Sequence, residues 1–343
     1  MDRRLLLVTL LAAACSKGEA PARQSGATTG DSAGGAVASA PAAPVVGASS
    51  APASPGSSSG SAAANLAGRI PVLEYHVIGG DKNTLYTRTA ASYRNDLETA
   101  YKLGYRPITV AQMLDKDFRD VPAGMAPVVV VFDDASDSQF RYIEKDGKLV
   151  VDPTSAVGIW EDFAKSHPGW KNRAVFCMLN GGGAGHNFFG DNPKYNGQKK
   201  EWRLQKVKYL ADQGHELCSH TLWHAKLSQY PDNVVQEQIA RNAMGIDSAV
   251  PGYRIRTIAL PYGLWPKNRP LAWQGSWTDP KTGKSHSYKF DAVLEVAGGP
   301  ARSPYDPQFN AKSINRIQAV GDDIAKQLTK LEQTNTRMVV GGK

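Results

Sequence analysis

The sequence predicts an α/β fold built on a parallel sheet, and two observations lead to this class. First, short apolar runs alternate with stretches of helical periodicity from about residue 70 to residue 333. Second, the run "VVVVF" (Val128–Phe132) is apolar at every position, as expected for a parallel strand that helices cover on both sides. This alternation implies a parallel sheet, either open or closed into a barrel.

The individual elements follow from these patterns. We expect strands over residues 70–78, 126–134, 173–182, 216–221, 255–263, 291–298 and 314–320. We expect helices over residues 89–105, 159–168, 200–215, 233–250 and 322–333. In the first helix Tyr93, Leu97, Ala100 and Tyr101 share one face, and Gly104 ends the helix.

The N-terminus predicts export. Residues 1–15, "MDRRLLLVTLLAAAC", have a charged start, a short apolar run and then small residues, as in a secretory signal peptide. The segment is too short to span a bilayer. The small residues lead into Cys15, which resembles the lipidated cysteine of bacterial lipoproteins, and Ser16 after it favours outer-membrane sorting. We therefore predict a lipid-anchored protein of the cell envelope, in the outer membrane or periplasm. Plain export with cleavage after Ala14 is the alternative.

Residues 16–68 consist mainly of Ala, Ser, Gly and Pro, so we predict a disordered linker there and a folded domain over residues 69–343. The net charge of +8 is scattered among acidic residues, with no basic stripe, so we expect no nucleic-acid partner. We expect a monomer. Beyond Cys15 the cysteines are Cys177 and Cys218, which we predict to be buried and unpaired. A disulfide between them is the alternative, if neighbouring parallel strands bring them together in an oxidising compartment.

Polar residues gather at the predicted carboxyl ends of the strands. Asp133 and Asp134 end one strand, and Asn180, His220 and Tyr262 lie at the ends of three others. Because active sites of parallel α/β folds form at the carboxyl ends of the strands, these positions predict one site.

A metal centre is the interpretation that best accounts for the paired carboxylates. His220 and His224 are four residues apart, and on a helical turn they would share a face. Together with Asp134 they make the open three-ligand set that is typical of catalytic zinc. The ion would offset the charge of Asp134 and leave Asp133 to act as a general base. The alternatives are surface histidines, and a polar loop that caps the following helix.

The stretches "VFDDAS", "SHTLWH" and "LPYG" resemble, in this order, three motifs of the polysaccharide deacetylase superfamily. This family, the family 4 carbohydrate esterases, is also known as the nodulation-type chitooligosaccharide deacetylase homology domain. The resemblance covers residues 71–320. It implies a distorted (β/α)7-type barrel and a divalent metal, zinc foremost, with Co²⁺ or Ni²⁺ also accepted. By this resemblance Asp133 matches the catalytic base, and Asp134, His220 and His224 match the metal ligands. Tyr262 matches the residue whose backbone N–H holds the oxyanion.

The sequence departs from the family pattern in three places. Ala135 replaces the glycine that follows the aspartates, which we expect to be tolerated at a negative φ. The arginine before Pro-Tyr is replaced by Ala259, and Arg173, Arg254, Arg256 and Arg316 are the candidates to supply its charge. The late Leu-x-His motif, which carries the general acid, is missing.

His76 is the candidate for the missing acid. In the biofilm poly-N-acetylglucosamine deacetylases, a Tyr-His near the end of the first strand takes this role, and His76 in "PVLEYHVIGG" has a matching context. A histidine suits the task because its ordinary pKa lies near neutral pH.

The predicted function is removal of acetyl groups from an acetylated polysaccharide. The resemblance implies N-acetyl groups of polysaccharide that contains N-acetylglucosamine, or of peptidoglycan. One alternative is a catalytically inactive, carbohydrate-binding lipoprotein with the deacetylase fold. The other is an esterase for O-acetyl groups of the xylan type.

Overall fold

The computed structural model describes residues 64–181, 187–190 and 198–342. All of them belong to the unit Ser58–Lys343. The predicted signal segment and nearly all of the predicted linker lie outside the described residues. Near the start of the described residues, the amide of Asn65 donates to the carbonyl of Val339 at 3.0 Å. No helix in the described ranges has the length and apolar character needed to cross a membrane.

A closed barrel of seven parallel strands forms the centre of this unit, in the order β2-β16-β14-β11-β10-β9-β6, with β6 pairing back to β2. This confirms the α/β class and the distorted (β/α)7-type barrel. The barrel strands are β2 (Val72–Tyr75), β6 (Ala126–Asp133), β9 (Val175–Met178), β10 (Glu216–Ser219), β11 (Thr257–Ala259), β14 (Ala292–Gly298) and β16 (Ile314–Gln318). A further strand, β5 (Tyr105–Pro107), pairs with the first residues of β6, where β9 has not yet begun to pair.

Alternating side chains divide the barrel strands into an inner and an outer face. On β6, Val129 and Val131 pack with residues of the other strands in one cluster, whereas Val130 and Phe132 pack in the cluster beneath the helices. Both faces are apolar, so every residue of β6 is buried. The same alternation places Asp133 on the inner face, at the carboxyl end of the strand.

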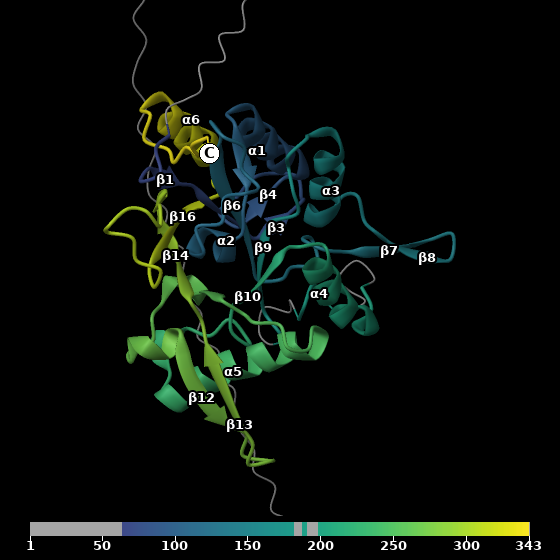
Figure 1. Cartoon of the computed structure of the whole chain (residues 1–343). Coiled ribbons are helices and arrows are strands. Elements are labelled where there is room, and N and C mark those ends of the chain that lie inside the picture. Colours follow the sequence, from purple (N-terminus) through teal and green to yellow (C-terminus); the bar gives the residue numbers. More distant parts are fainter. Residues whose placement is uncertain (1–63, 182–186, 191–197, 343) are drawn as a thin grey trace, which may run out of the picture. The chain divides into compact units, whose positions relative to one another are not determined.

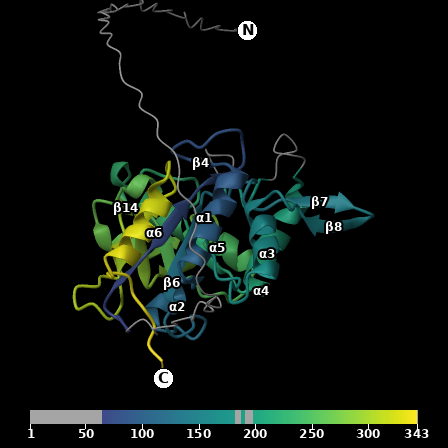
Figure 2. The same cartoon turned by 90° about the horizontal axis from the view of Figure 1, so that it is seen from above.

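Helices cover the outer face of the barrel. They are α1 (Ala90–Lys102), α3 (Ala156–Ser166), α4 (Arg203–Asp212), α5 (Asp232–Ala249) and α6 (Asp323–Gln333). The short helix α2 (Val110–Leu114) instead packs Val110 and Met113 in the cluster of the inner face. Thr89 caps α1 by accepting a hydrogen bond from the amide of Ser92, and Ser155 caps α3 in the same way. Figure 2 shows α6, α1 and α3 beside one another on the outside of the strands.

Several short elements surround the barrel, and Figure 1 shows the β7–β8 hairpin extending away from it. The paired strands are β7 (Tyr142–Lys145) with β8 (Lys148–Val151), β12 (Gln274–Thr278) with β13 (Ser285–Lys289), β1 (Arg69–Ile70) with β15 (Ala301–Arg302), and β3 (Val77–Ile78) with β4 (Thr87–Arg88). Short 3₁₀ turns cover Lys200–Trp202, Leu227–Gln229, Pro261–Gly263 and Arg269–Ala272.

The two barrel cysteines form a disulfide, so the prediction of two unpaired thiols is wrong. Cys177 on β9 lies directly opposite Cys218 on β10 in the parallel register, and their Cα atoms are 4.1 Å apart. The sequence placed both cysteines in strands. It carried no information on the register, which decides that they face each other.

Candidate active site

All six predicted site residues line one cavity at the carboxyl end of the barrel. Its volume is about 200 Å³. The lining residues are Glu74, His76, Tyr86, Asp133, Asp134, His220, His224, Leu260, Tyr262, Val296 and Arg316. A larger hollow of about 430 Å³ between α5 and β13 shares none of these residues. We therefore place the chemistry in the smaller cavity.

The two histidines converge through an irregular loop, so the expected helical turn is wrong. The chain leaves β10 at His220 and turns through positive φ angles at Thr221 (69°) and His224 (61°). The two imidazole rings nevertheless lie 4.9 Å apart. The spacing in the sequence predicted the meeting of the side chains but not the backbone that produces it.

Backbone strain gathers around the same cavity. Asp134, Ala135 and Tyr262 have φ angles of 79°, 52° and 58°, in the left-handed region. The expectation of a negative φ at Ala135 is therefore wrong: the chain turns sharply after β6, and the carbonyl of Ala135 accepts the amide of Phe189 at 2.7 Å. Each such residue costs roughly 1–3 kcal/mol, and this kind of strain is typical of functional sites.

Asp134, His220 and His224 form a group that can hold a metal ion. Oδ1 of Asp134 lies 3.3 Å from Nε2 of His220 and 3.5 Å from Nε2 of His224. The Nδ1–H of His220 donates to the carbonyl of Ala259 at 2.9 Å, so the lone pair of Nε2 faces the cavity. Nε2 of His220 and Oδ1 of Asp134 are buried without a hydrogen-bond partner among the described residues. A divalent cation would satisfy both atoms, so the site fits the predicted metal.

The electrostatics favour the metal-binding protonation states of Asp134 and His224, whereas burial of His220 is outweighed by Asp133 and Asp134, which raise the pKa of His220. Burial alone would raise the pKa of Asp134, but His220, His76 and His224 outweigh it and lower the pKa. Burial, reinforced by the charge of His220, lowers the pKa of His224 to about 4. The site therefore offers a carboxylate and a neutral imidazole, the forms that coordinate metal ions.

Arg316 supplies the positive charge that the family pattern places at position 259, where this chain has Ala259. Its Nη1 donates to both carboxylate oxygens of Asp133, at 2.9 and 2.8 Å, from the inner face of β16. The other three candidates, Arg173, Arg254 and Arg256, pair with carboxylates outside the cavity. The guanidinium is fully buried, so its pairing with Asp133 holds the base in one orientation.

The sequence reasoning missed Glu74. This carboxyl is 1 % exposed, and its Oε2 lies 3.4 Å from Nε of Arg316. Burial, with the charge of Asp133, raises the pKa of Glu74 to about 8 although Arg316 opposes the shift. One signal could have identified it: residues two apart in a strand share a face, so Glu74 must point the same way as His76.

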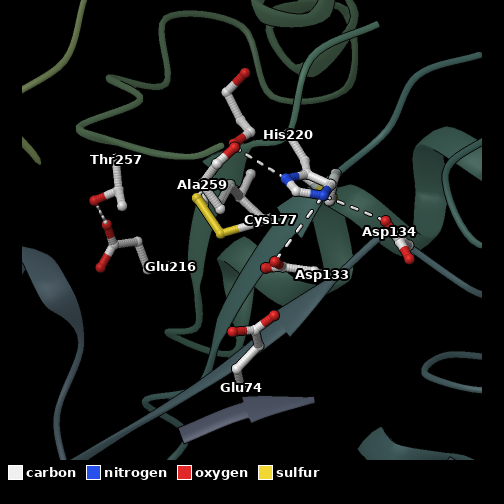
Figure 3. Close-up of a disulfide and its surroundings, with 12 residues drawn as sticks. Glu74, Asp133, Asp134, Cys177, Glu216, His220, Thr257 and Ala259 are labelled. Atoms are coloured by element: carbon white, nitrogen blue, oxygen red, sulfur yellow. Dashed lines mark hydrogen bonds and ion pairs between the residues drawn. A yellow bond between two sulfur atoms is a disulfide. The ribbon is translucent and has the colours of Figure 1, made fainter. Parts of the chain in front are cut away.

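His76 lies between β2 and β3 and contacts two side chains of the cavity. Its Nε2 is 3.5 Å from Oε1 of Glu74, and its ring packs edge-on against Tyr86 at 5.2 Å between centroids. Burial lowers the pKa of His76 although Asp133 and Asp134 oppose the shift. Figure 3 shows His220 facing Asp133 and Asp134, with Glu74 on the far side of Asp133.

Known sequences and structures resemble this chain in the same region. The profile of the family described as Polysaccharide deacetylase matches residues 172–273, which include His220, His224 and Tyr262. The chitooligosaccharide deacetylase of Sinorhizobium fredii (strain NBRC 101917 / NGR234) is 35 % identical over 63 residues. That match covers 18 % of this chain and 29 % of the relative, so the chain matches less than a third of the relative's length.

Solved structures share the fold at low identity. The deacetylase PplD of Streptococcus pyogenes, in complex with acetate, aligns with a TM-score of 0.53 and 16 % identity over 77 % of this chain and 98 % of its own. BC0361, a polysaccharide deacetylase from Bacillus cereus, gives 0.52 and 16 % over 77 % and 69 %. IcaB from Ammonifex degensii gives 0.50 and 16 % over 78 % and 97 %. The chain therefore carries a polysaccharide deacetylase domain signature, on a barrel with the fold of the solved deacetylases.

Proposed function

We propose that this chain is a metal-dependent hydrolase that removes acetyl groups from an acetylated polysaccharide. One observation carries the proposal: the group Asp134, His220 and His224 lies beside a carboxylate, Asp133, that Arg316 holds in place. A site that only binds a metal ion would need Asp134, His220 and His224 but not Asp133. The adjacent, oriented base is what points to hydrolysis.

The residues of the chain divide the work of an amide hydrolysis. Asp134, His220 and His224 would hold a divalent ion, zinc foremost, which as a Lewis acid would polarise the acyl carbonyl and favour ionisation of a water molecule. Asp133 accepts the proton of the attacking water. Its Oδ2 is 4.0 Å from Nε2 of His220, so the base lies next to the ligand group.

The remaining residues act on the acyl group and the leaving group. The backbone N–H of Tyr262 would stabilise the developing oxyanion, and the apolar side chains of Leu260 and Val296 leave a place for the acetyl methyl group. His76 protonates the departing nitrogen. The side chain of Tyr262 is 49 % exposed at the cavity mouth, where it can contact a sugar ring.

The substrate we propose carries N-acetyl groups, as polymers of N-acetylglucosamine and peptidoglycan do. The deacetylase signature over residues 172–273 supports this class. We further propose an exported protein, anchored in the cell envelope through a lipid at Cys15. The disulfide between Cys177 and Cys218 supports export, because disulfides are rare in cytosolic proteins.

Acetate release tests the proposal. The full-length protein is incubated with peptidoglycan, poly-N-acetylglucosamine, chitooligosaccharide and acetylated xylan, with and without a chelator. We expect release from an N-acetylated polymer that the chelator abolishes and that added Zn²⁺, Co²⁺ or Ni²⁺ restores. Release from xylan alone would indicate an O-acetyl esterase, and binding without release from any polymer would indicate an inactive carbohydrate-binding protein.

A further inference from the structure

Glu74 is a buried acid that the reaction described above does not use. Neither of its carboxyl oxygens has a hydrogen-bond partner among the described residues. Burying an unsatisfied carboxyl costs several kcal/mol. Such a group in the middle of a cavity wall calls for an explanation.

Glu74 stands between the acid and the base of the proposed reaction. Its Oε1 is 3.5 Å from Nε2 of His76, and its Oε2 is 3.4 Å from Nε of Arg316. Arg316 in turn binds both oxygens of Asp133. The contacts therefore run without interruption from His76 through Glu74 and Arg316 to Asp133.

Two carboxylates of this group contact one guanidinium. Nη1 of Arg316 lies 2.8 Å from Asp133, and its Nε lies 3.4 Å from Glu74. Among the described residues that line the cavity, Arg316 is the one Lys or Arg side chain, and its single charge can offset one of these two carboxylates. The second carboxylate would remain buried and uncompensated, which is strongly unfavourable. A proton shared by Glu74 and His76 removes this imbalance.

We propose that Glu74 is a positioning residue that shares one proton with His76 and fixes that histidine relative to Arg316 and Asp133. The inference rests on the proposed function. It adds the residue that keeps His76, the general acid of that reaction, protonated. In the reaction, the C–N bond breaks with its electron pair going to nitrogen, and the imidazolium N–H bond breaks as the amine N–H bond forms. The pair is left as neutral imidazole and carboxylate, and it takes a proton from solvent before the next turnover.

The pH dependence follows from the groups that face the pair. Asp133 and Asp134 face both members from β6 and its end, Arg316 faces them from β16, and His220 faces them after β10. Tyr86, Arg88 and Ala319 complete the wall beside them, and Arg88 is paired with Asp96. Two coupled groups share their macroscopic pKa values, so the proton of the pair belongs to neither residue alone. Burial raises the pKa of Glu74 to about 8, whereas burial lowers that of His76.

The first experiment needs no turnover. The full-length, metal-free protein is prepared with isotope-labelled histidine, and the His76 signal is assigned by its loss in His76→Ala. Because the pair holds its proton jointly, we expect the His76 signal to titrate at a higher pH in the parent than in Glu74→Gln. In Glu74→Gln we expect it to titrate below the ordinary 6.5, because burial then acts on a lone imidazole. Equal titration of His76 in the two proteins would overturn the proposal. Because no acetate is measured, this result is independent of whether the protein is a deacetylase.

The second readout is the pH profile of the loaded enzyme. We expect Glu74→Gln to move the alkaline limb of kcat to lower pH by more than about one unit, a loss of at least tenfold at pH 8. We expect an unchanged KM and one bound ion per chain in both proteins. Two ions in the parent and one in the variant would overturn the proposal, because Glu74 would then be a metal ligand.

Glu216→Gln is the matched control. Glu216 is also a buried carboxyl of the barrel, but it accepts hydrogen bonds from Thr257 and from the amide of Ala111, and Figure 3 shows it apart from Glu74. We expect this variant to lose stability while His76 titrates as in the parent. If Glu74→Gln does not fold, Glu74→Asp replaces it. There the carboxyl is set back by one methylene, so we expect the titration of His76 to fall partway, and an unchanged titration would again contradict the proposal.

Discussion

Reduction of the Cys177–Cys218 disulfide offers a quantitative test of the barrel. The bridge links β9 to β10 across 41 residues of sequence. In the chain-entropy model, a cross-link that closes a loop of this length stabilises the folded state by about 4 kcal/mol. For a domain of this size, that corresponds to a fall in Tm of roughly 8–16 °C on reduction.

The assay is thermal unfolding of the full-length protein with and without reductant. Reduction leaves both sulfur atoms in place, so it removes the cross-link without opening a cavity. The double variant Cys177→Ala, Cys218→Ala is the control, and its Tm should not respond to reductant. A non-reduced digest should contain the two cysteine peptides as one linked species.

Two results would refute this reasoning. A digest in which both peptides carry free thiols would show that the strands do not present the cysteines to each other as described. If the bridge is present but its reduction leaves Tm unchanged, the cross-link does not lower the conformational entropy of the unfolded chain as the model assumes.

Three further changes test the site and its support. Arg316→Lys keeps the charge but has one nitrogen, so it cannot bind Asp133 and also make the contacts of Nε with Glu74 and the carbonyl of Glu295. We expect kcat to fall by about 10²-fold with a much smaller change in KM, and near-parental kcat in steady-state assays would contradict this role. His224→Ala removes a ligand, so affinity for Zn²⁺, measured by competition with a coloured chelator, should fall by more than about 10²-fold; parental affinity would exclude His224 from the metal site. Burial opposes ionisation of Asp120, but hydrogen bonds led by that from Lys171 lower its pKa to about 2. This stabilisation is present above pH 3.8 and is lost as the pH falls toward 2, so Asp120→Asn should cost roughly 1–2 kcal/mol in denaturant unfolding at neutral pH and nothing near pH 2.

Much of the barrel could be predicted because strands such as β6 and β9 are apolar on both faces. Each strand of the ring falls within a predicted run, and α5 (Asp232–Ala249) begins one residue before the prediction. The missed elements lack this signal. The strand Tyr105–Pro107 is short, and the β12–β13 hairpin alternates polar with partly buried residues, so neither forms an apolar run.

The site was predictable where its residues lie in compact motifs. Asp133 and Asp134 are adjacent, and His220 and His224 are four apart. Arg316 could only be named among four candidates, because it meets Asp133 across β2, which pairs with both β16 and β6 in the closed ring, and no local pattern encodes this closure. The positive φ of Ala135 also escaped prediction, since an alanine gives no sign of a left-handed turn.

The most direct test of the central claim is acetate release by Asp133→Asn, measured together with its metal content. The parent should release acetate from an N-acetylated polymer and lose that activity in chelator. The variant should keep one ion on Asp134, His220 and His224 while release falls by about 10²–10⁴-fold, because only the base is lost. Near-parental release by a fully loaded Asp133→Asn variant would contradict the assignment of Asp133. Release by the parent that survives complete removal of metal would contradict the metal-dependent mechanism.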